Sequence, residues 1–271
     1  MRPGFGAELR LRILSAIVMG AAAIGTAVWG GWPFAVFWCA AGVAILWEWG
    51  RFVSPSLGRN LALIGLAAVI GSAVFAFLGR PSDIVWVAVA SLVAAVVVSR
   101  GLWGAAGIAY AGGVAAATVL LRSDPIWGLT AIVLTFAVVW STDSAAYFGG
   151  RLIGGPKLWP QVSPKKTWSG ALTGTIAAMV AGLAVAVCAG APRLAPVALV
   201  CFAMSVASQL GDLLESSIKR HFGVKDASAL IPGHGGVMDR LDGFIFAVAL
   251  ASIVGFVRGG FEGPSRGLLI W

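Results

Sequence analysis

Carboxylates and lysines collect near the carboxyl end of a chain that is otherwise apolar. Segment 216–244, SSIKRHFGVKDASALIPGHGGVMDRLDGF, carries much of this charge. At helical spacing, Asp212 and Glu215 share a face with Lys219, and Asp239 lies one turn before Asp242. Converging carboxylates repel one another, and all-oxygen ligands favour Mg²⁺ or Mn²⁺ over zinc. The pattern predicts such a metal site; structural salt bridges, for example of Asp212 or Glu215 with Lys219 or Arg220, are the alternative.

All five lysines of the chain fall between residues 157 and 225, although arginine outnumbers lysine. In QVSPKKTWSG, residues 161–170, a turn led by proline brings Lys165 and Lys166 to the start of an apolar run. Lysines beside the N–H groups of a helix N-terminus form an anion site suited to a triphosphate. A basic loop on anionic lipid is the alternative. Gly170 and Gly174 form a GxxxG pattern, which predicts close helix packing.

The GHGG stretch offers backbone N–H groups to anionic oxygens, because Gly235 and Gly236 let the backbone come close to a ligand. His234 has no second histidine at the spacing that a zinc site needs. We expect His234 to form hydrogen bonds and not to bind a metal.

The elements that position these residues are membrane helices. Of the 271 residues, 59% are hydrophobic and 11% are charged, far more apolar than a soluble domain. The sequence predicts an all-α, polytopic integral membrane protein with about nine transmembrane helices. The apolar runs are 13–29, 34–47, 61–78, 84–98, 102–121, 126–148, 168–190, 194–218 and 244–257, of which the second and last are short for a span.

Basic residues predict the orientation. With the amino terminus inside, fourteen of the nineteen lysines and arginines face the cytoplasm. This bias, together with attraction to anionic lipid headgroups, explains the net charge of +8. We therefore expect no nucleic-acid partner. Cys39, Cys188 and Cys201 lie in apolar runs and predict no redox role. We expect residues 1–140 to form a scaffold with contacts for an oligomer, such as a homodimer, and residues 141–271 to be catalytic, within one continuous membrane domain.

Segment 216–242 resembles the signature of the phosphatidate cytidylyltransferases, the CDP-diacylglycerol synthases. The matching positions are Ser216, Ile218, Lys219, Arg220, Lys225, Asp226, Ser228, Ile231, Pro232, 234–237 (HGGV) and 239–242 (DRLD). Two further stretches are similar to family blocks: STDSAAYFGGRLIG, residues 141–154, and SPKKT, residues 163–167. One departure is Ser169, two residues after the threonine, where the family commonly has an acid.

The resemblance implies transfer of the cytidylyl group of CTP to phosphatidate, which gives CDP-diacylglycerol and pyrophosphate in phospholipid synthesis. It implies that Asp212, Asp239, Asp242, Lys219 and Arg220 are catalytic, and that the metal ligands are the three aspartates with Glu215 and, more weakly, Asp143. It implies nucleotide binding by Ser163, Lys165, Lys166, Asp143, His234, Gly235 and Gly236, and binding of the lipid phosphate or leaving group by Lys219, Arg220 and Arg240. Such a reaction needs alignment and charge neutralisation more than covalent help.

Two other functions stay open at this point. A CTP-dependent lipid kinase, acting on a polyprenol, would share the layout, although the intact run through Asp242 argues against it. An ion-coupled transporter would place its acids at the membrane midplane and not at one end of the helices. Enrichment in alanine, glycine and arginine favours a bacterium with a GC-rich genome, and hence an inner-membrane protein with its active site facing the cytoplasm.

Overall fold

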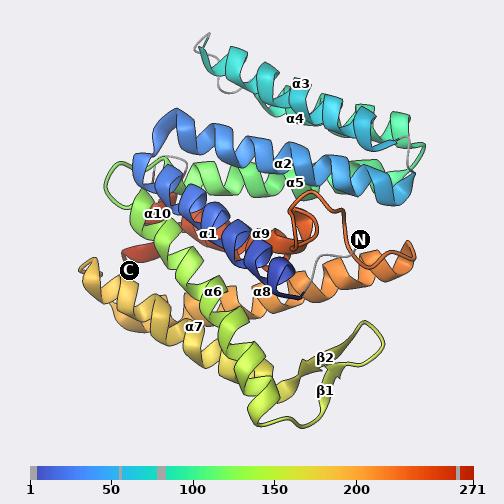
Figure 1. Ribbon diagram of the computed structural model, residues 1–271. Helices are drawn as coiled ribbons and strands as arrows, with labels where there is room; N and C mark the ends of the chain where they lie inside the picture. The colour runs from blue at the N-terminus through green and yellow to red at the C-terminus, as the bar shows by residue number, and fades with distance from the viewer. Residues whose placement is uncertain (1–4, 55–56, 78–83, 261–262) are drawn as a thin grey trace. The chain divides into compact units, whose positions relative to one another are not determined.

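The computed structural model describes residues 5–54, 57–77, 84–260 and 263–271 (Figure 1). The described chain is helical apart from one short β-hairpin. Its elements are α1 (Phe5–Trp29), α2 (Gly31–Val53), α3 (Leu57–Phe77), α4 (Ile84–Ser99), α5 (Leu102–Arg122), α6 (Gly128–Leu152), β1 (Lys157–Trp159), β2 (Ser163–Thr167), α7 (Trp168–Cys188), α8 (Leu194–His221), α9 (Met238–Gly259) and α10 (Pro264–Leu269).

Among the described residues, eight helices are long and apolar enough to cross a membrane, and a shorter apolar helix covers Trp86–Ser99. This confirms a polytopic helical membrane protein. The two runs that looked short belong to α2, with 23 residues, and α9, with 22 residues. Both helices extend beyond the apolar run into charged residues, Glu48 and Arg51 in α2 and Asp239 and Asp242 in α9. The ranges predicted from hydropathy were therefore shorter than the helices.

The chain forms two compact units, and neither is continuous in sequence. Unit 1 comprises Met1–Ile24, Ala35–Ala115 and Phe222–Arg240; unit 2 comprises Gly25–Phe34, Ala116–His221 and Leu241–Trp271. These units cut across the division at residue 140 that the sequence suggested. That division concerned a scaffold half and a catalytic half, and it stays a prediction about function.

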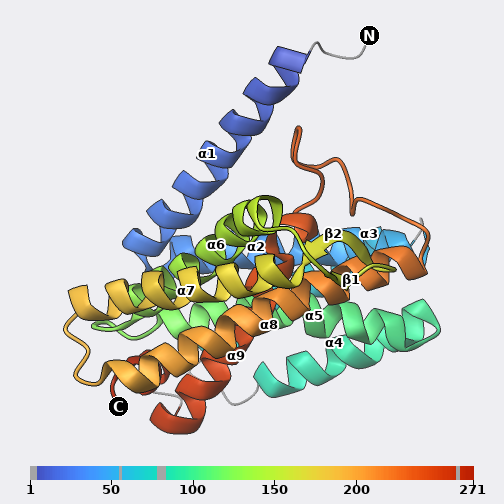
Figure 2. The ribbon, with the colours of Figure 1, turned by 90° about the horizontal axis from the view of Figure 1, so that it is seen from below.

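In unit 2, α6, α7 and α8 pack side by side (Figure 2). The contact between α6 and α7 depends on glycines: a Cβ on Gly170 would lie 2.7 Å from the carbonyl oxygen of Ala146, and one on Gly174 would lie 2.7 Å from that of Thr142. The predicted close packing of the GxxxG pattern is therefore confirmed. Lipid tails are as apolar as the helices, so no hydrophobic driving force holds membrane helices together. Small residues instead let their backbones pack closely.

Buried hydroxyl groups then fix α8 against its neighbours. Thr142 Oγ1 lies 2.8 Å from Ser205 Oγ, which also bonds to Thr175 Oγ1 at 3.3 Å. The side-chain amide of Gln209 donates to the same Thr175 oxygen at 3.0 Å. Hydrogen bonds of this kind across membrane helices contribute about 0.6 kcal/mol each. They fix the rotation of α8 about its axis within two turns of its first acid, Asp212.

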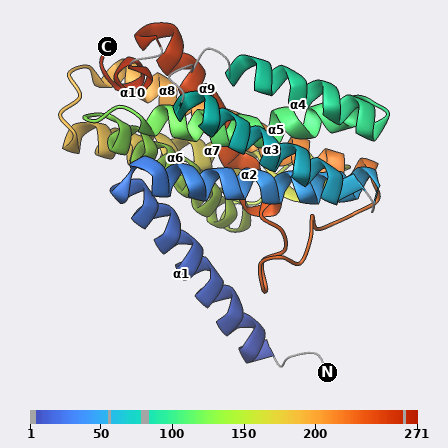
Figure 3. The same cartoon turned by 90° about the horizontal axis from the view of Figure 1, so that it is seen from above.

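In unit 1, α3 and α4 run alongside each other (Figure 3). Helix α2 approaches α3 through a pair of glycines, because a Cβ on Gly50 would lie 2.5 Å from the Cα of Gly58. It approaches the unit 1 part of α5 in the same way, since a Cβ on Gly42 would lie 3.0 Å from the carbonyl oxygen of Ala111. The indole N–H of Trp49 donates to the carbonyl of Trp103 at 2.8 Å. These contacts hold α2 against α3 and against the unit 1 part of α5.

Candidate active site

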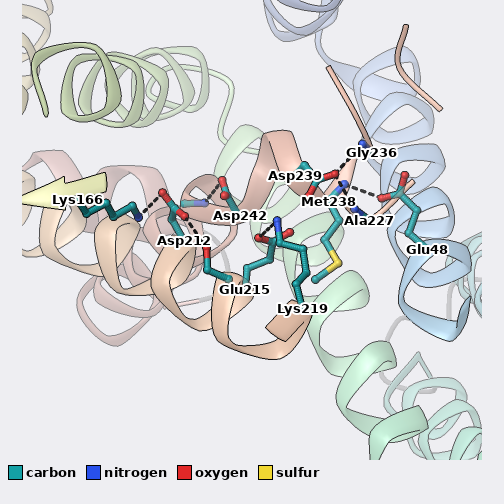
Figure 4. Close-up of polar contacts among 12 residues, drawn as sticks. Glu48, Lys166, Asp212, Glu215, Lys219, Ala227, Gly236, Met238, Asp239 and Asp242 are labelled. Carbon is teal, nitrogen blue, oxygen red and sulfur yellow. Dashed lines mark hydrogen bonds and ion pairs between the residues drawn. The ribbon is translucent and has the colours of Figure 1, made fainter. Parts of the chain in front are cut away.

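Two acids of unit 2 meet where α8 and α9 cross. The crossing is close, because a Cβ on Gly211 would lie 2.8 Å from the carbonyl oxygen of Asp242, and one on Gly243 would lie 2.5 Å from Ser208 Oγ. The next residue after Gly211 is Asp212, so the crossing brings the carboxylates of Asp212 and Asp242 toward the same space (Figure 4). Asp242 also lies within electrostatic range of Glu215 and Asp143.

Two lysines neutralise part of this negative charge. Lys166 forms an ion pair with Asp212, and the ammonium group of Lys219 lies 2.6 Å from a carboxylate oxygen of Glu215, which is fully buried (Figure 4). The second pair spans one helical turn, as the i, i+4 spacing predicted. Salt bridges were the alternative to a metal site, and one of them, between Glu215 and Lys219, is present. Asp212, however, pairs with Lys166 and not with a basic residue of its own helix.

Asp212 and Asp242 could together hold a Mg²⁺ ion. Mg²⁺ commonly binds through one or two carboxylates and completes its octahedron with waters and substrate phosphates. Among the residues that the structure describes, no group of three or more His, Cys, Asp or Glu side chains is placed to hold a metal ion. Two carboxylates are enough for a Mg²⁺ ion that also binds waters and phosphate oxygens.

Lysines 165 and 166 lie on a β-hairpin, which the sequence did not predict. Strand β1 pairs antiparallel with β2, with Trp159 opposite Ser163 and Lys157 opposite Thr167. Helix α7 begins only after this strand, at Trp168, with the Thr167 hydroxyl accepting from the N–H of Gly170 at 3.1 Å. The lysines were expected at a helix N-terminus. They lie instead on a strand that ends where α7 begins. Lys165 is exposed on β2, whereas Lys166 is partly buried and pairs with Asp212.

Ser169, where the family commonly has an acid, ties the start of α7 to the preceding loop. Its hydroxyl bonds to the carbonyl oxygen of Gly154 and lies 3.0 Å from Thr167 Oγ1. At this position the side chain holds the base of the hairpin together.

The other half of the signature lies in unit 1, where residues 222–237 form a loop that we call the signature loop. A bridge between Ile231 and Gly235 closes its tip, with the N–H of Ile231 donating to the carbonyl of Gly235 at 2.8 Å. Asp239 fixes the base of the loop: its Oδ2 accepts from the N–H groups of Ala227 and Gly236, both at 2.8 Å. In the structure this Gly236 N–H serves a carboxylate of the protein itself.

Glu48, which the sequence analysis did not select, is fully buried on α2 in the same unit. Its Oε1 accepts from the hydroxyl of Ser228 at 2.6 Å and from the N–H of Val237 at 2.9 Å, and its Oε2 accepts from the N–H of Met238 at 2.8 Å (Figure 4). The acid thereby caps the N-terminus of α9, where unpaired N–H groups favour a negative charge. A signal was present: Glu48 is the one acid in the sequence of α2.

His234 connects the tip of the signature loop to α1. Its Nδ1 lies 2.7 Å from the hydroxyl of Ser15, which also bonds to the carbonyl of Pro232 at 3.1 Å. Burial lowers the pKa of the His234 imidazole below its ordinary value, and the charges of Arg240 and Arg12 lower it further. A lowered pKa favours the neutral ring, which suits the hydrogen bond that His234 forms with Ser15.

The predicted site residues thus fall into two groups. Unit 2 holds Asp143, Ser163, Lys165, Lys166, Asp212, Glu215, Lys219, Arg220 and Asp242; unit 1 holds His234, Gly235, Gly236, Asp239 and Arg240. Asp212, Asp242, Lys166, Glu215 and Lys219 come together directly, whereas Arg220 and Arg240 are exposed at the surface of their own units. The roles predicted for all of these residues stay predictions.

The fold is that of a multi-span helical membrane protein, and its candidate site pairs carboxylates with lysines, groups that can bind phosphate and a divalent cation. The chain belongs to the cytidylyltransferase family, whose model matches residues 10–257. It is 42% identical to the phosphatidate cytidylyltransferase of Brucella suis over 95% of this chain and 97% of that protein. The enzyme of the same name from Bacillus subtilis is 43% identical over 47% of this chain and 48% of that protein. The resemblance found in the signature is therefore confirmed.

Proposed function

We propose that the chain transfers the cytidylyl group of CTP to phosphatidate, forming CDP-diacylglycerol and pyrophosphate. The observation that carries this proposal is the crossing of α8 and α9, which brings the Asp212 and Asp242 carboxylates together and where Asp212 pairs with Lys166. The chain that carries this site is 42% identical to a phosphatidate cytidylyltransferase over nearly its whole length. Acids and lysines side by side suit a reaction between two phosphates, in which negative charge must be both held and neutralised.

The chain's own residues supply alignment and charge. Lys165 and Lys166, on the hairpin, are assigned to the triphosphate, and Lys219 beside Glu215 to the lipid phosphate or leaving group. An oxygen of the lipid phosphate forms a bond to the α-phosphorus while the bond from that phosphorus to the pyrophosphate oxygen breaks. A phosphate nucleophile needs little help from a general base, so the mechanism assigns none.

Mg²⁺ is the proposed cofactor, with Asp212 and Asp242 as its ligands. When bound, it would neutralise charge on the phosphate oxygens during the displacement. Asp239, whose Oδ2 holds the signature loop, is a weaker candidate than the sequence suggested. Glu215 is an additional candidate ligand, and its ion pair with Lys219 parallels that of Asp212 with Lys166. Mn²⁺ offers the same oxygen chemistry.

Labelled CTP tests the reaction. With purified protein, Mg²⁺ and phosphatidate, CTP labelled at the α-phosphorus should give a labelled lipid, and CTP labelled at the γ-phosphorus should give labelled pyrophosphate alone. A polyprenol in a parallel tube serves as the alternative acceptor. Label reaching lipid from the γ position and not from the α position would show a lipid kinase instead, and label from neither in folded protein would reopen the transporter.

We also propose that the protein lies in a bacterial plasma (inner) membrane with the hairpin and the signature loop facing the cytoplasm. Positive charge is concentrated on that side, and the relatives named above are bacterial. The homodimer suggested for the amino-terminal helices stays a prediction.

Cysteine labelling checks this orientation. Ser123 and Ser163 flank α6, so a spanning α6 puts them on opposite sides of the membrane. In a variant lacking Cys39, Cys188 and Cys201, Ser123→Cys should react with an impermeant maleimide on intact cells, whereas Ser163→Cys should react only after lysis. Equal reaction of both in intact cells would refute the sidedness or the span of α6.

A further inference from the structure

We infer that Glu48 is a positioning residue for the substrate-binding signature loop, an inference that rests on the proposed function. It acts at a distance from the reacting phosphates, through the backbone of residues 227–238. No position in α2 belongs to the signature, to the hairpin or to the acids at the α8–α9 crossing.

The contacts show what Glu48 holds. Its two oxygens accept three hydrogen bonds, from Ser228 inside the signature loop, from Val237 at the end of the loop and from Met238 at the start of α9. Ser228 in turn accepts from the N–H of Leu230 at 3.0 Å. One side chain therefore ties the interior of the loop to its carboxyl end and to the first turn of α9, which carries Asp239.

The glycine pair fits closely around this acid. A Cβ on Gly236 would lie 2.6 Å from Glu48 Oε1 and 2.8 Å from the Cβ of Ala227. Gly235 has a φ of +87°, and a Cβ there would lie 2.9 Å from Asp239 Oδ2. Both glycines thus permit the backbone to close around two carboxylates of the protein, Glu48 and Asp239.

Glutamine cannot replace Glu48 in this role. A carboxylate accepts at both oxygens, whereas an amide accepts at one atom and donates from the other. In Glu48→Gln, an NH₂ group must face either the N–H of Met238 or the Val237 N–H and Ser228 hydroxyl. The loop then loses its single arrangement, and substrate has to select the competent one.

The kinetic result distinguishes positioning from a purely structural role. If the competent arrangement falls to about a tenth of the population, the apparent affinity falls roughly tenfold while saturating substrate restores turnover. We expect Glu48→Gln to raise the KM of CTP or of phosphatidate roughly tenfold and to leave kcat within about twofold. Unchanged KM for both substrates, with or without a fall in kcat, would overturn the inference.

Hydrogen exchange tests the same inference without using activity, so its failure is separable from failure of the proposed function. In Glu48→Gln, the amides of Val237 and Met238 should exchange faster than in the wild-type protein, and those of α7 should be unchanged. Protection of residues 237 and 238 equal to that in the wild-type protein would overturn the proposal even if the labelled-CTP experiment succeeds.

Leu46→Met, a volume-conserving change at a buried position on the same helix, is the matched control and should alter neither KM nor exchange. Ser228→Ala, which removes one of the three donors, should give a smaller effect in the same direction.

Discussion

Asp242→Asn protein, inserted normally in membranes, is expected to form CDP-diacylglycerol at least about a hundredfold more slowly than the wild type. The amide keeps the volume of the side chain and its acceptor for the N–H of Gly243, at 2.8 Å in the structure, but removes the negative charge beside Asp212. Loss of metal-centred charge stabilisation worth about 3 kcal/mol corresponds to roughly a hundredfold in rate. Turnover of labelled CTP at saturating Mg²⁺ measures it.

The matched control is Asp124→Asn, another acid of unit 2. Asp124 Oδ1 accepts from the N–H groups of Ile126 and Trp127, both at 2.8 Å, and an asparagine oxygen can accept both in the same way. This variant should retain its activity. Near-wild-type turnover in Asp242→Asn would remove Asp242 from the proposed metal pair, and an equal loss in both variants would point to insertion and not to chemistry.

Gly236→Ala is expected to lower both the temperature of half-inactivation and the activity. The added Cβ would meet Glu48 Oε1 and the Cβ of Ala227, and neither can move away, because Glu48 is 0% and Ala227 7% exposed. Overpacking of this kind costs about 1–3 kcal/mol. Residual activity after heating steps, compared with the wild type in the same detergent, gives the shift.

Gly113→Ala supplies the comparison, since a Cβ at that position of α5 has no atom within 4 Å. Alanine in an open helical position favours the helix by roughly 0.5–1 kcal/mol, so this variant should be as heat-resistant as the wild type or more so. If Gly236→Ala matched it in both measurements, the tight fit around Glu48 would be wrong.

Hydropathy and helical spacing were enough to predict the membrane helices and the acids of α8, because both depend on residues close in sequence. The i, i+4 pair of Glu215 with Lys219 is one example. The partner of Asp212 was missed, since Lys166 reaches it from a hairpin whose pairing no local pattern announced. SPKKT contains a proline and two adjacent lysines, which favour a loop over a strand.

The signature loop shows the same limit. Gly235 and Gly236 were predicted to let the backbone come close to a ligand, and this stays a prediction; in the structure the groups close to them include Asp239 and Glu48. Glu48 precedes its loop donors by 180 to 190 residues, and a single carboxylate in an apolar helix carries no sign of such a distant partner. Only the folded chain shows the contact.

That separation has a consequence for biosynthesis. Helix α2 leaves the ribosome well before the signature loop exists, and at about 5–20 residues per second the 190 residues up to Met238 take roughly 10–40 s. During this interval the nascent α2 carries Glu48 into the bilayer without any of its three native donors, against an insertion cost of up to about 2.5–3.5 kcal/mol for an acid at the helix centre. Synthesis of Met238 ends that interval, so the first residue of α9 supplies the last of the three donors to an acid on the second helix.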